Sequence, residues 1–298
     1  MAISQFKATT ADLITSITSR GLVPTNQNTY TTAQMLQIAD EELQTGLLPL
    51  VLSTQEEYYS TYLDYTAPGM TMTLPDRAIG GKLRAVVYTN LGKEWSIPRI
   101  ELEDVAWTTQ PSYYFRGNEI VFTEQPPYSV RLYYHTRPSH LIQTSECGRI
   151  ASIDPMTNSL TLSSVPSTYT TGLTYDVVSS SAPAKVKALD QTVLTIVGTV
   201  LTFTALPTAI VGDYFCLSGQ SPAIQLPYEL IPVLAQRVAV KVLEGIGDMD
   251  GSKRAQEKLN EMEPRAFRLL EPRSDAQPHK VINRNSGIRR NGRNQTTY

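Results

Sequence analysis

Residues 225–248 have the sequence QLPYELIPVLAQRVAVKVLEGIGD, which predicts a helix. The prediction of the fold starts from this helix. Apolar side chains recur there every four residues, opposite polar ones such as Gln236 and Lys241, and this spacing is typical of an amphipathic helix. Pro232 fits such a helix only in its first turn, and Gly245 is the expected C-terminal stop. The periodic apolar residues are Leu230, Leu234, Val238 and Val242.

A second amphipathic helix is expected directly after the first, with Asp248 or Asp250 as its cap and a kink at Pro264. Its apolar positions alternate in steps of four and three, which resembles a heptad seam. They are Ala255, Leu259, Met262, Ala266 and Leu269. The two helices are expected to form a hairpin in which the following residues pack within the bundle or against a neighbouring subunit: Leu234, Val238, Leu259, Met262 and Leu269.

The N-terminal part of the chain predicts the remaining helices of this bundle. Thr31 and Gln34 have capping-box spacing, and the apolar residues after them share one helical face, with Pro49 near the expected end. A shorter helix is expected over residues 9–19, where Thr9 and Asp12 repeat the capping-box spacing. Residues 1–56 and 225–275 are therefore predicted to form one helical bundle.

Between these helical segments the pattern changes to that of β-strands. Short runs rich in Tyr and Val are bounded by Pro, Gly and Asn, which is typical of strands joined by tight turns. The runs cover residues 58–65, 70–74, 82–89, 112–115, 119–122 and 129–136. Residues 57–145 are thus expected to form an antiparallel sheet or small sandwich, with a short helical or turn segment at residues 99–104.

Residues 146–220 have the composition of an inserted small β domain, rich in Thr and Ser. The sequence LTLSSVP at 160–166 is repeated as LTFTALP at 201–207, at an offset of 41 residues. Two such units would bury their apolar faces against each other in a small β-barrel or β-sandwich, because one unit alone cannot. The fold class predicted from the whole pattern is α+β.

Charge is distributed unevenly along the 298 residues. The formal net charge is -2, and Lys280, Arg284, Arg289, Arg290 and Arg293 lie in a C-terminal segment without an acid, so residues 1–279 carry -7. The segment 276–298 is therefore predicted to be a basic extended tail on an acidic body. Such a tail could keep the protein soluble, dock on an acidic protein surface or bind nucleic acid.

No pattern in the sequence indicates an enzyme. The three histidines, His135, His140 and His279, form no metal-binding motif, and the sequence lacks a Walker loop, a dinucleotide-binding GxGxxG and a GxSxG elbow. We therefore expect no catalytic residue, no metal site and no cofactor. Cys147 and Cys216 lie near the two ends of the insertion, so they are expected to be spatial neighbours with free, buried thiols.

Two further classes of protein are disfavoured by the sequence. Residues 1–17 contain one Lys and no apolar segment, so no secretory signal is expected. The uncharged residues 191–212 alternate like a strand and contain Gly198 and Pro207, so they are not expected to span a membrane.

The order of these parts resembles the head-to-tail connector proteins of bacteriophages, also called adaptor or head completion proteins. The similarity rests on Ala39-Asp-Glu-Glu-Leu43, the Tyr58-Tyr59 to Leu74-Pro75 stretch, Leu83-Arg-Ala-Val86, Trp95 and, above all, residues 225–248. The insertion at 146–220 is an elaboration that many smaller connectors lack.

This resemblance implies a virion structural protein that forms a ring, usually twelvefold, beneath the portal protein. It implies the portal, a tail or nozzle protein and further copies of the chain as partners, with genomic DNA passing through the channel without sequence-specific binding. The location implied is the head-tail junction, after synthesis in the bacterial host cytoplasm. The basic residues Lys280, Arg284, Arg289, Arg290 and Arg293 would then dock on the portal.

Two alternatives remain open at this stage. A tail or baseplate protein could use the inserted β domain to bind a host-surface carbohydrate, and exposed aromatic clusters would favour that interpretation. A glycan-cleaving enzyme could use the carboxylates of Glu101, Glu103 and Asp104 as general acid and base.

Overall fold

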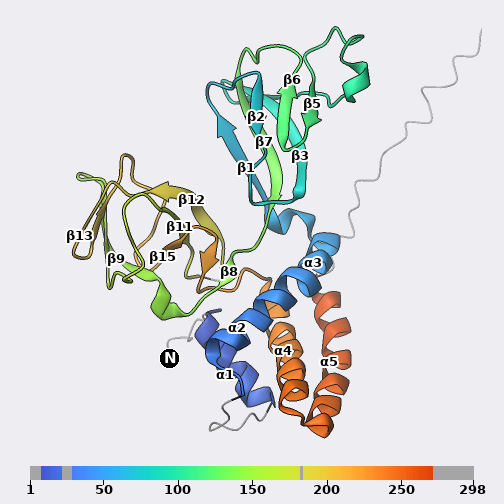
Figure 1. Ribbon diagram of the computed structural model, residues 1–298, viewed down its shortest axis with the longest axis vertical. Helices are drawn as coiled ribbons and strands as arrows, with labels where there is room; N and C mark the ends of the chain where they lie inside the picture. The colour runs from blue at the N-terminus through green and yellow to red at the C-terminus, as the bar shows by residue number, and fades with distance from the viewer. Residues whose placement is uncertain (1–7, 22–28, 182–183, 271–298) are drawn as a thin grey trace, which may run out of the picture.

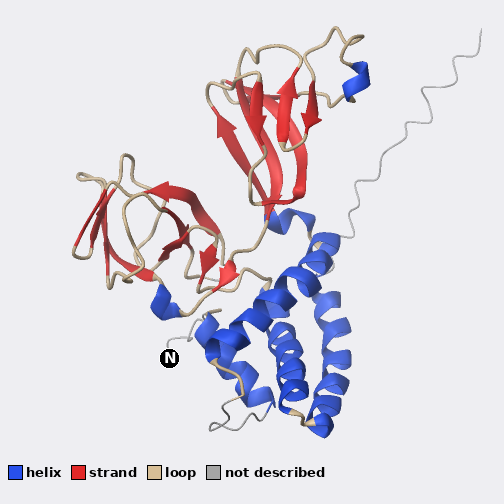
Figure 2. Ribbon diagram, viewed as in Figure 1, coloured by secondary structure: helices blue, strands red, loops and turns tan. Residues whose placement is uncertain are grey.

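The computed structural model describes residues 8–21, 29–181 and 184–270 and has an α+β fold. A body of helices formed by both ends of the chain carries two β modules, which project from it in different directions (Figure 1). Helices and strands are segregated, as Figure 2 shows. The predicted fold class is confirmed.

The helical body contains α1 (Thr10–Gly21), α2 (Thr32–Glu41), α3 (Leu48–Thr54), α4 (Ile231–Ile246) and α5 (Met249–Leu270). Thr31 caps α2 in the predicted capping box: its Oγ1 accepts a hydrogen bond from the Gln34 backbone N–H, and the Gln34 side chain accepts one from the Thr31 backbone N–H. In the middle of the body Arg237 of α4 contacts Glu42 (Nη1–Oε2 3.2 Å) and Glu263 of α5 (Nε–Oε1 2.6 Å). The apolar faces of these helices form one core cluster.

Pro49 does not lie near the end of a helix, contrary to the expectation. Helix α2 continues through a π-helical segment, Glu42–Leu47, into α3, where Pro49 occupies the first turn. Proline lacks a backbone N–H and blocks the ordinary helical hydrogen bond. In the wider π turns the Leu48 N–H bonds to the Leu43 carbonyl, so the helix continues through Pro49 without a break.

Gly245 also does not end α4, because the helix runs two residues further than predicted. Gly247 ends it in the left-handed conformation, with φ 88°. Gly245 lies where Tyr30 packs against the helix, and a side chain there would collide with the Tyr30 ring. The Asp248 side chain accepts a hydrogen bond from the Gly251 N–H (2.9 Å), so Asp248 is the cap of α5.

The first β module, which we call the sandwich, spans residues 60–136. Its four-stranded sheet has the order β1-β7-β3-β4, and a three-stranded sheet of order β2-β6-β5 packs on it around one apolar core. Of the two predicted alternatives, a sandwich rather than a single sheet is formed. Its strands are β1 (Ser60–Tyr65), β2 (Thr71–Thr73), β3 (Ala78–Asn90), β4 (Lys93–Ser96), β5 (Tyr113–Arg116), β6 (Glu119–Phe122) and β7 (Ser129–Thr136).

The second β module, which we call the inserted module, is one antiparallel sheet of order β12-β11-β15-β9-β10-β14-β13, curved around a single core (Figure 1). The two copies of the sequence repeat pair directly, with Leu160 opposite Leu201. The strands are β9 (Gly148–Asp154), β10 (Ser159–Leu162), β11 (Thr174–Val178), β12 (Val186–Thr192), β13 (Thr195–Val197), β14 (Val200–Thr202) and β15 (Tyr214–Leu217). The short parallel strands β8 (His140–Leu141) and β16 (Gln220–Ser221) pair where the chain enters and leaves it.

Candidate interaction surfaces

The residues predicted to pack in the bundle do not share one environment. Leu234 and Val238 are fully buried, and Leu259 is buried as well. Met262 is half-buried, with its Sδ 3.8 Å from Nη1 of Arg20. Leu269 is 59% exposed, so it does not pack in the core of the bundle, and α5 turns the neighbouring Leu270 inward instead. The alternative for Leu269, packing against a neighbouring subunit, stays a prediction.

The predicted portal-docking residues lie outside the described part of the chain. These are Lys280, Arg284, Arg289, Arg290 and Arg293. Helix α5, which precedes them, ends beside α3, where the Gln55 side chain donates a hydrogen bond to the Leu270 carbonyl (3.0 Å). Helix α5 therefore ends at the end of the helical body nearest the sandwich (Figure 1).

The described histidines each contact a different carboxylate. His135 Nε2 lies 3.2 Å from Glu56 Oε1, and His140 Nδ1 lies 2.6 Å from Asp40 Oδ2. Within residues 8–21, 29–181 and 184–270, no three His, Cys, Asp or Glu side chains gather in a way that could hold a metal ion. His279 lies outside these ranges.

Cys147 and Cys216 are neighbours, as expected from their positions at the ends of the insertion. Both thiols are free and buried in the same apolar cluster. Burial, together with a hydrogen bond to Cys147, raises the pKa of the Cys216 thiol. A thiol with a raised pKa and no access to solvent is a poor nucleophile, so Cys216 is a structural cysteine.

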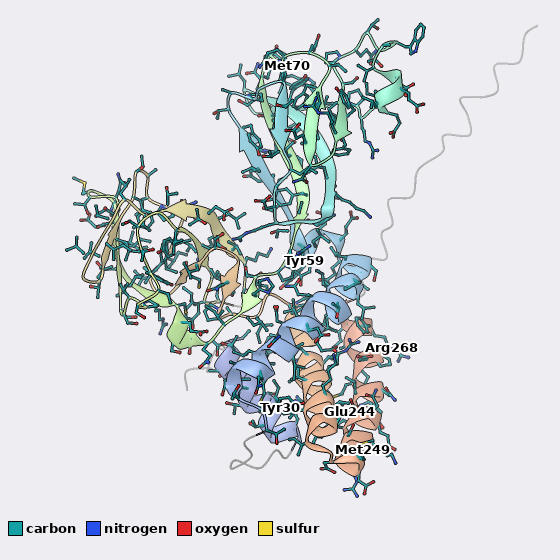
Figure 3. All side chains as sticks on the ribbon, in the orientation of Figure 1. Tyr30, Tyr59, Met70, Glu244, Met249 and Arg268 are labelled. Atoms are coloured by element: carbon teal, nitrogen blue, oxygen red, sulfur yellow. The ribbon has the colours of Figure 1, made fainter. Side chains whose placement is uncertain are left out.

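Large apolar side chains are exposed at the end of the sandwich farthest from the helices. Trp107 is 85% exposed and Leu102 is 63% exposed on the loop that carries the short 3₁₀ helix Leu102–Asp104. Met70, 41% exposed, lies at the same end (Figure 3). Because burying a tryptophan is strongly favourable and exposing one is rare, we regard this loop as a candidate contact surface.

The acidic cluster predicted from the sequence lies on this same loop. Glu101, Glu103 and Asp104 are exposed, and Glu101 pairs with Arg99 (3.1 Å). A carboxyl that serves as a general acid near neutral pH works best with a raised pKa, which burial in a cleft provides. Carboxylates spread over an exposed loop are suited instead to surround an apolar contact such as Trp107.

Arg131 organises the outer face of the four-stranded sheet. Its guanidinium donates two hydrogen bonds to Asp64 (2.6 and 2.9 Å) and one to Glu94 (2.8 Å), and it stacks over the Tyr62 ring at 4.0 Å from the centroid. The hydrogen bonds to Asp64 are the main cause that raises the pKa of Arg131. This network joins β1, β7 and β4 and fixes charged side chains beside both edges of the sheet.

The two β modules contact each other through Arg77, on the loop between β2 and β3. Its Nη2 lies 2.7 Å from Oδ2 of Asp176 on β11, and it also donates a hydrogen bond to Ser218 (2.6 Å). Asp176 is completely buried and accepts two further hydrogen bonds, from the backbone N–H groups of Asp190 and Gly219 (both 3.0 Å). This contact sets how the sandwich lies against the inserted module.

The aromatic rings of the inserted module are all buried. They are Tyr169, Tyr175, Phe203, Tyr214 and Phe215, and each is at most 8% exposed. Sugars stack on exposed rings, so the feature that would favour carbohydrate binding by this module is missing from its surface. Its exposed large apolar side chains are aliphatic, among them Met156 (92%) and Val197 (72%).

Local sequence patterns could not identify these contact surfaces. Trp107 follows the short helical or turn segment expected at residues 99–104, but no periodic pattern distinguishes an exposed tryptophan from a buried one. Asp176 and Arg77 are 99 residues apart in sequence, so only the three-dimensional fold brings them together. The one usable signal was the cluster of acids next to Trp107.

Comparison of the sequence with protein-family models and with curated proteins gives no match. Among the described helices, none is both long enough and apolar enough to cross a membrane.

Proposed function

We propose that this chain is a virion structural protein that forms a ring and joins the portal to the tail as a head-to-tail adaptor around the DNA channel. The proposal starts from the resemblance in the sequence. The observation that carries it further is the exposure of Trp107 and Met156 on two β modules that project from one helical body. Separate projecting surfaces allow one subunit to contact several partners at once.

The charges of the chain support the same proposal. Residues 1–279 carry a net negative charge, and an acidic channel wall repels the DNA backbone, so DNA can slide without sticking. The basic tail supplies the opposite charge for docking on the portal. Its docking residues are Lys280, Arg284, Arg289, Arg290 and Arg293.

Electron microscopy of the purified full chain at rising concentration tests the ring. Closed rings with rotational symmetry and a central channel are the expected result. If the chain stays monomeric alone and also in the presence of the portal protein, it is not an adaptor ring.

A pull-down with the portal protein of the same phage tests the tail. A chain that lacks residues 280–298 should keep its fold and lose portal binding. Unchanged capture of the shortened chain would assign the portal contact to another surface.

A further inference from the structure

The four-stranded sheet of the sandwich has two open edges, β1 and β4. Every neighbouring pair in the order β1-β7-β3-β4 is antiparallel, and within the described residues no strand pairs with the outer side of β1 or β4. All four residues of β4 are exposed, and so are Tyr62, Leu63 and Asp64 in β1. An open edge presents backbone N–H and C=O groups that can pair with another strand.

The two edges run in opposite directions, because an antiparallel sheet with an even number of strands ends on antiparallel edges. If β4 of one copy lies beside β1 of the next, the antiparallel alternation continues across the boundary. Such a contact joins two different surfaces of the same chain. Repeated by rotation, a contact of this kind closes into a ring.

We propose that β4 of one copy pairs with β1 of the next copy, so that the sandwiches of neighbouring subunits share one continuous antiparallel sheet. This inference rests on the proposed ring and names the surfaces that hold its subunits together. Two physical arguments support it: the direction of the free backbone groups and the register of the strands.

The backbone groups at the two edges are directed suitably for pairing. The Ile97 N–H donates to the Val86 carbonyl (2.9 Å), so alternation along β4 directs the backbone groups of Glu94 and Ser96 away from β3. The same alternation, followed across β3 and β7, directs those of Asp64 away from β7. Ser96 of one copy and Asp64 of the next can therefore form a hydrogen-bonded pair.

The rows of the sheet set the register. Asp64, Arg131, Val87 and Ser96 form one cross-strand row, and Tyr65, Val130, Tyr88 and Trp95 form the next. If the ring axis is parallel to the strands, neighbouring copies are not shifted along the strand direction. Each row of one copy then continues directly into the same row of the next copy. Ser96 then lies opposite Asp64 of the next copy, and Trp95 lies opposite Tyr65.

Charge and apolar contact favour this register over the nearest alternative on β1. Sliding by two residues toward the start of β1 would place Glu94 opposite Asp64, and like charges directly opposite each other destabilise a sheet. In the proposed register Trp95, which is 45% exposed, lies opposite Tyr65 of the next copy. Leu63, which is 37% exposed, lies opposite Ile97 of the neighbouring copy. The partly exposed rings of Trp95 and Tyr65 thus cover each other, and Leu63 gains an apolar neighbour whose own side chain is already buried.

Disulfide cross-linking tests this pairing in the full chain. In the variant Asp64→Cys with Ser96→Cys, the paired positions would lie about 5.5 Å apart between Cα atoms, a distance that a disulfide can bridge. Mild oxidation should then produce a ladder of covalent multimers on a non-reducing gel, and reduction should abolish it. The native Cys147 and Cys216 are buried, so the wild-type chain is expected to give no ladder.

The control variant carries Ser60→Cys with Ser96→Cys. In the proposed register these positions are displaced by four residues, about 13 Å along the strand, and cannot be joined. Electron microscopy of the same unoxidised samples shows whether rings are present. A ladder from the control variant alone would overturn the proposed register.

The remaining outcomes separate this inference from the proposed function. Closed rings without a ladder from either variant would overturn the edge pairing and leave the adaptor ring intact. A ladder with open filaments and no closed ring would support the pairing and overturn the adaptor ring. Monomers without a ladder, also when the portal protein is added, would overturn both.

Discussion

Arg77 reaches across the boundary between the two β modules and places its Nη2 2.7 Å from Oδ2 of Asp176, a carboxyl with no exposure to solvent. A separate contact ties the base of the sandwich to the helical body, since Tyr59 (Figure 3) donates a hydrogen bond to the Gln225 carbonyl (2.7 Å) just before α4. A buried charge is stable only while its partners stay in place. Arg77 therefore joins the two β modules through a buried ion pair.

Replacing Arg77 by Ala should destabilise the protein strongly. The variant leaves the Asp176 carboxyl buried without its counter-charge, and the loss of such a partner costs about 3 kcal/mol of unfolding free energy. Urea unfolding followed by circular dichroism measures the loss. The matched control is Arg84→Ala, because Arg84 pairs with Glu57 at 2.5 Å on the exposed surface, and its unfolding curve should hardly move. Equal losses for both variants would contradict a special role of Arg77.

The free energy of unfolding should depend on pH because of Asp176. Burial, only partly offset by Arg77, raises the pKa of Asp176 above the ordinary value of about 3.9. A carboxyl whose pKa is higher in the folded chain binds its proton more tightly there, so its contribution to stability falls as the pH rises through the unfolded and then the folded pKa.

The variant Asp176→Asn isolates this effect, because it cannot titrate at this position. The unfolding free energy of the wild type minus that of the variant should decrease as the pH is raised from about 3 to 7. Urea unfolding at several pH values measures the difference. If the difference grows with pH, the attraction of Arg77 outweighs burial and the folded pKa is lowered.

The pairing of the two sequence repeats should dominate the stability of the inserted module. Leu160 is completely buried opposite Leu201, so Leu160→Ala should cost about 2–5 kcal/mol through lost burial and the cavity left behind. Val197, on the same sheet but 72% exposed, is the control, and Val197→Ala should change the stability by less than about 0.5 kcal/mol. Thermal and urea unfolding test both, and similar effects would mean that the repeat does not form the core.

The sequence predicted the positions of helices and strands well where a short local motif determines the backbone geometry. Thr31 and Gln34 marked the start of α2, and the repeat at Leu160 and Leu201 indicated two strands that need each other. The errors have local physical causes. Pro49 was expected near the end of a helix, but a π-helical segment before it accommodates the missing N–H and the helix continues. Of the two neighbours at the end of α5, Leu270 is the buried one, and Leu269 is exposed.

The candidate surfaces could be predicted far less well from sequence. The contact of Arg77 with Asp176 and the exposure of Trp107 depend on how whole modules pack. Neither feature is indicated by a periodic pattern of apolar residues in the sequence. Cys147 and Cys216 are the exception. Their position at the two ends of an insertion predicted their proximity, because the ends of an inserted module must lie close together.

Two glycines at the end of α4 should respond differently to the same substitution. Gly247 has φ 88° and open space around it, so Gly247→Ala should cost about 1 kcal/mol from backbone strain alone. At Gly245 an added methyl group would meet the ring of Tyr30, so the loss in Gly245→Ala should be relieved in combination with Tyr30→Ala. A double-mutant cycle measures the coupling, and strict additivity would exclude the steric cause.

The two tryptophans should report separately on the two kinds of contact proposed for this protein. Trp95 lies on the β4 edge, stacked on Tyr128, whereas Trp107 lies on the loop at the far end of the sandwich. Trp107→Phe leaves Trp95 as the only indole, and ring formation should then reduce quenching of its fluorescence by acrylamide, because the strand of the next copy covers it. Trp95→Phe leaves Trp107, whose quenching should stay high in the ring and fall only when a tail protein binds. If both indoles become protected together on ring formation, the far-end loop belongs to the contact between subunits and is not free for the tail.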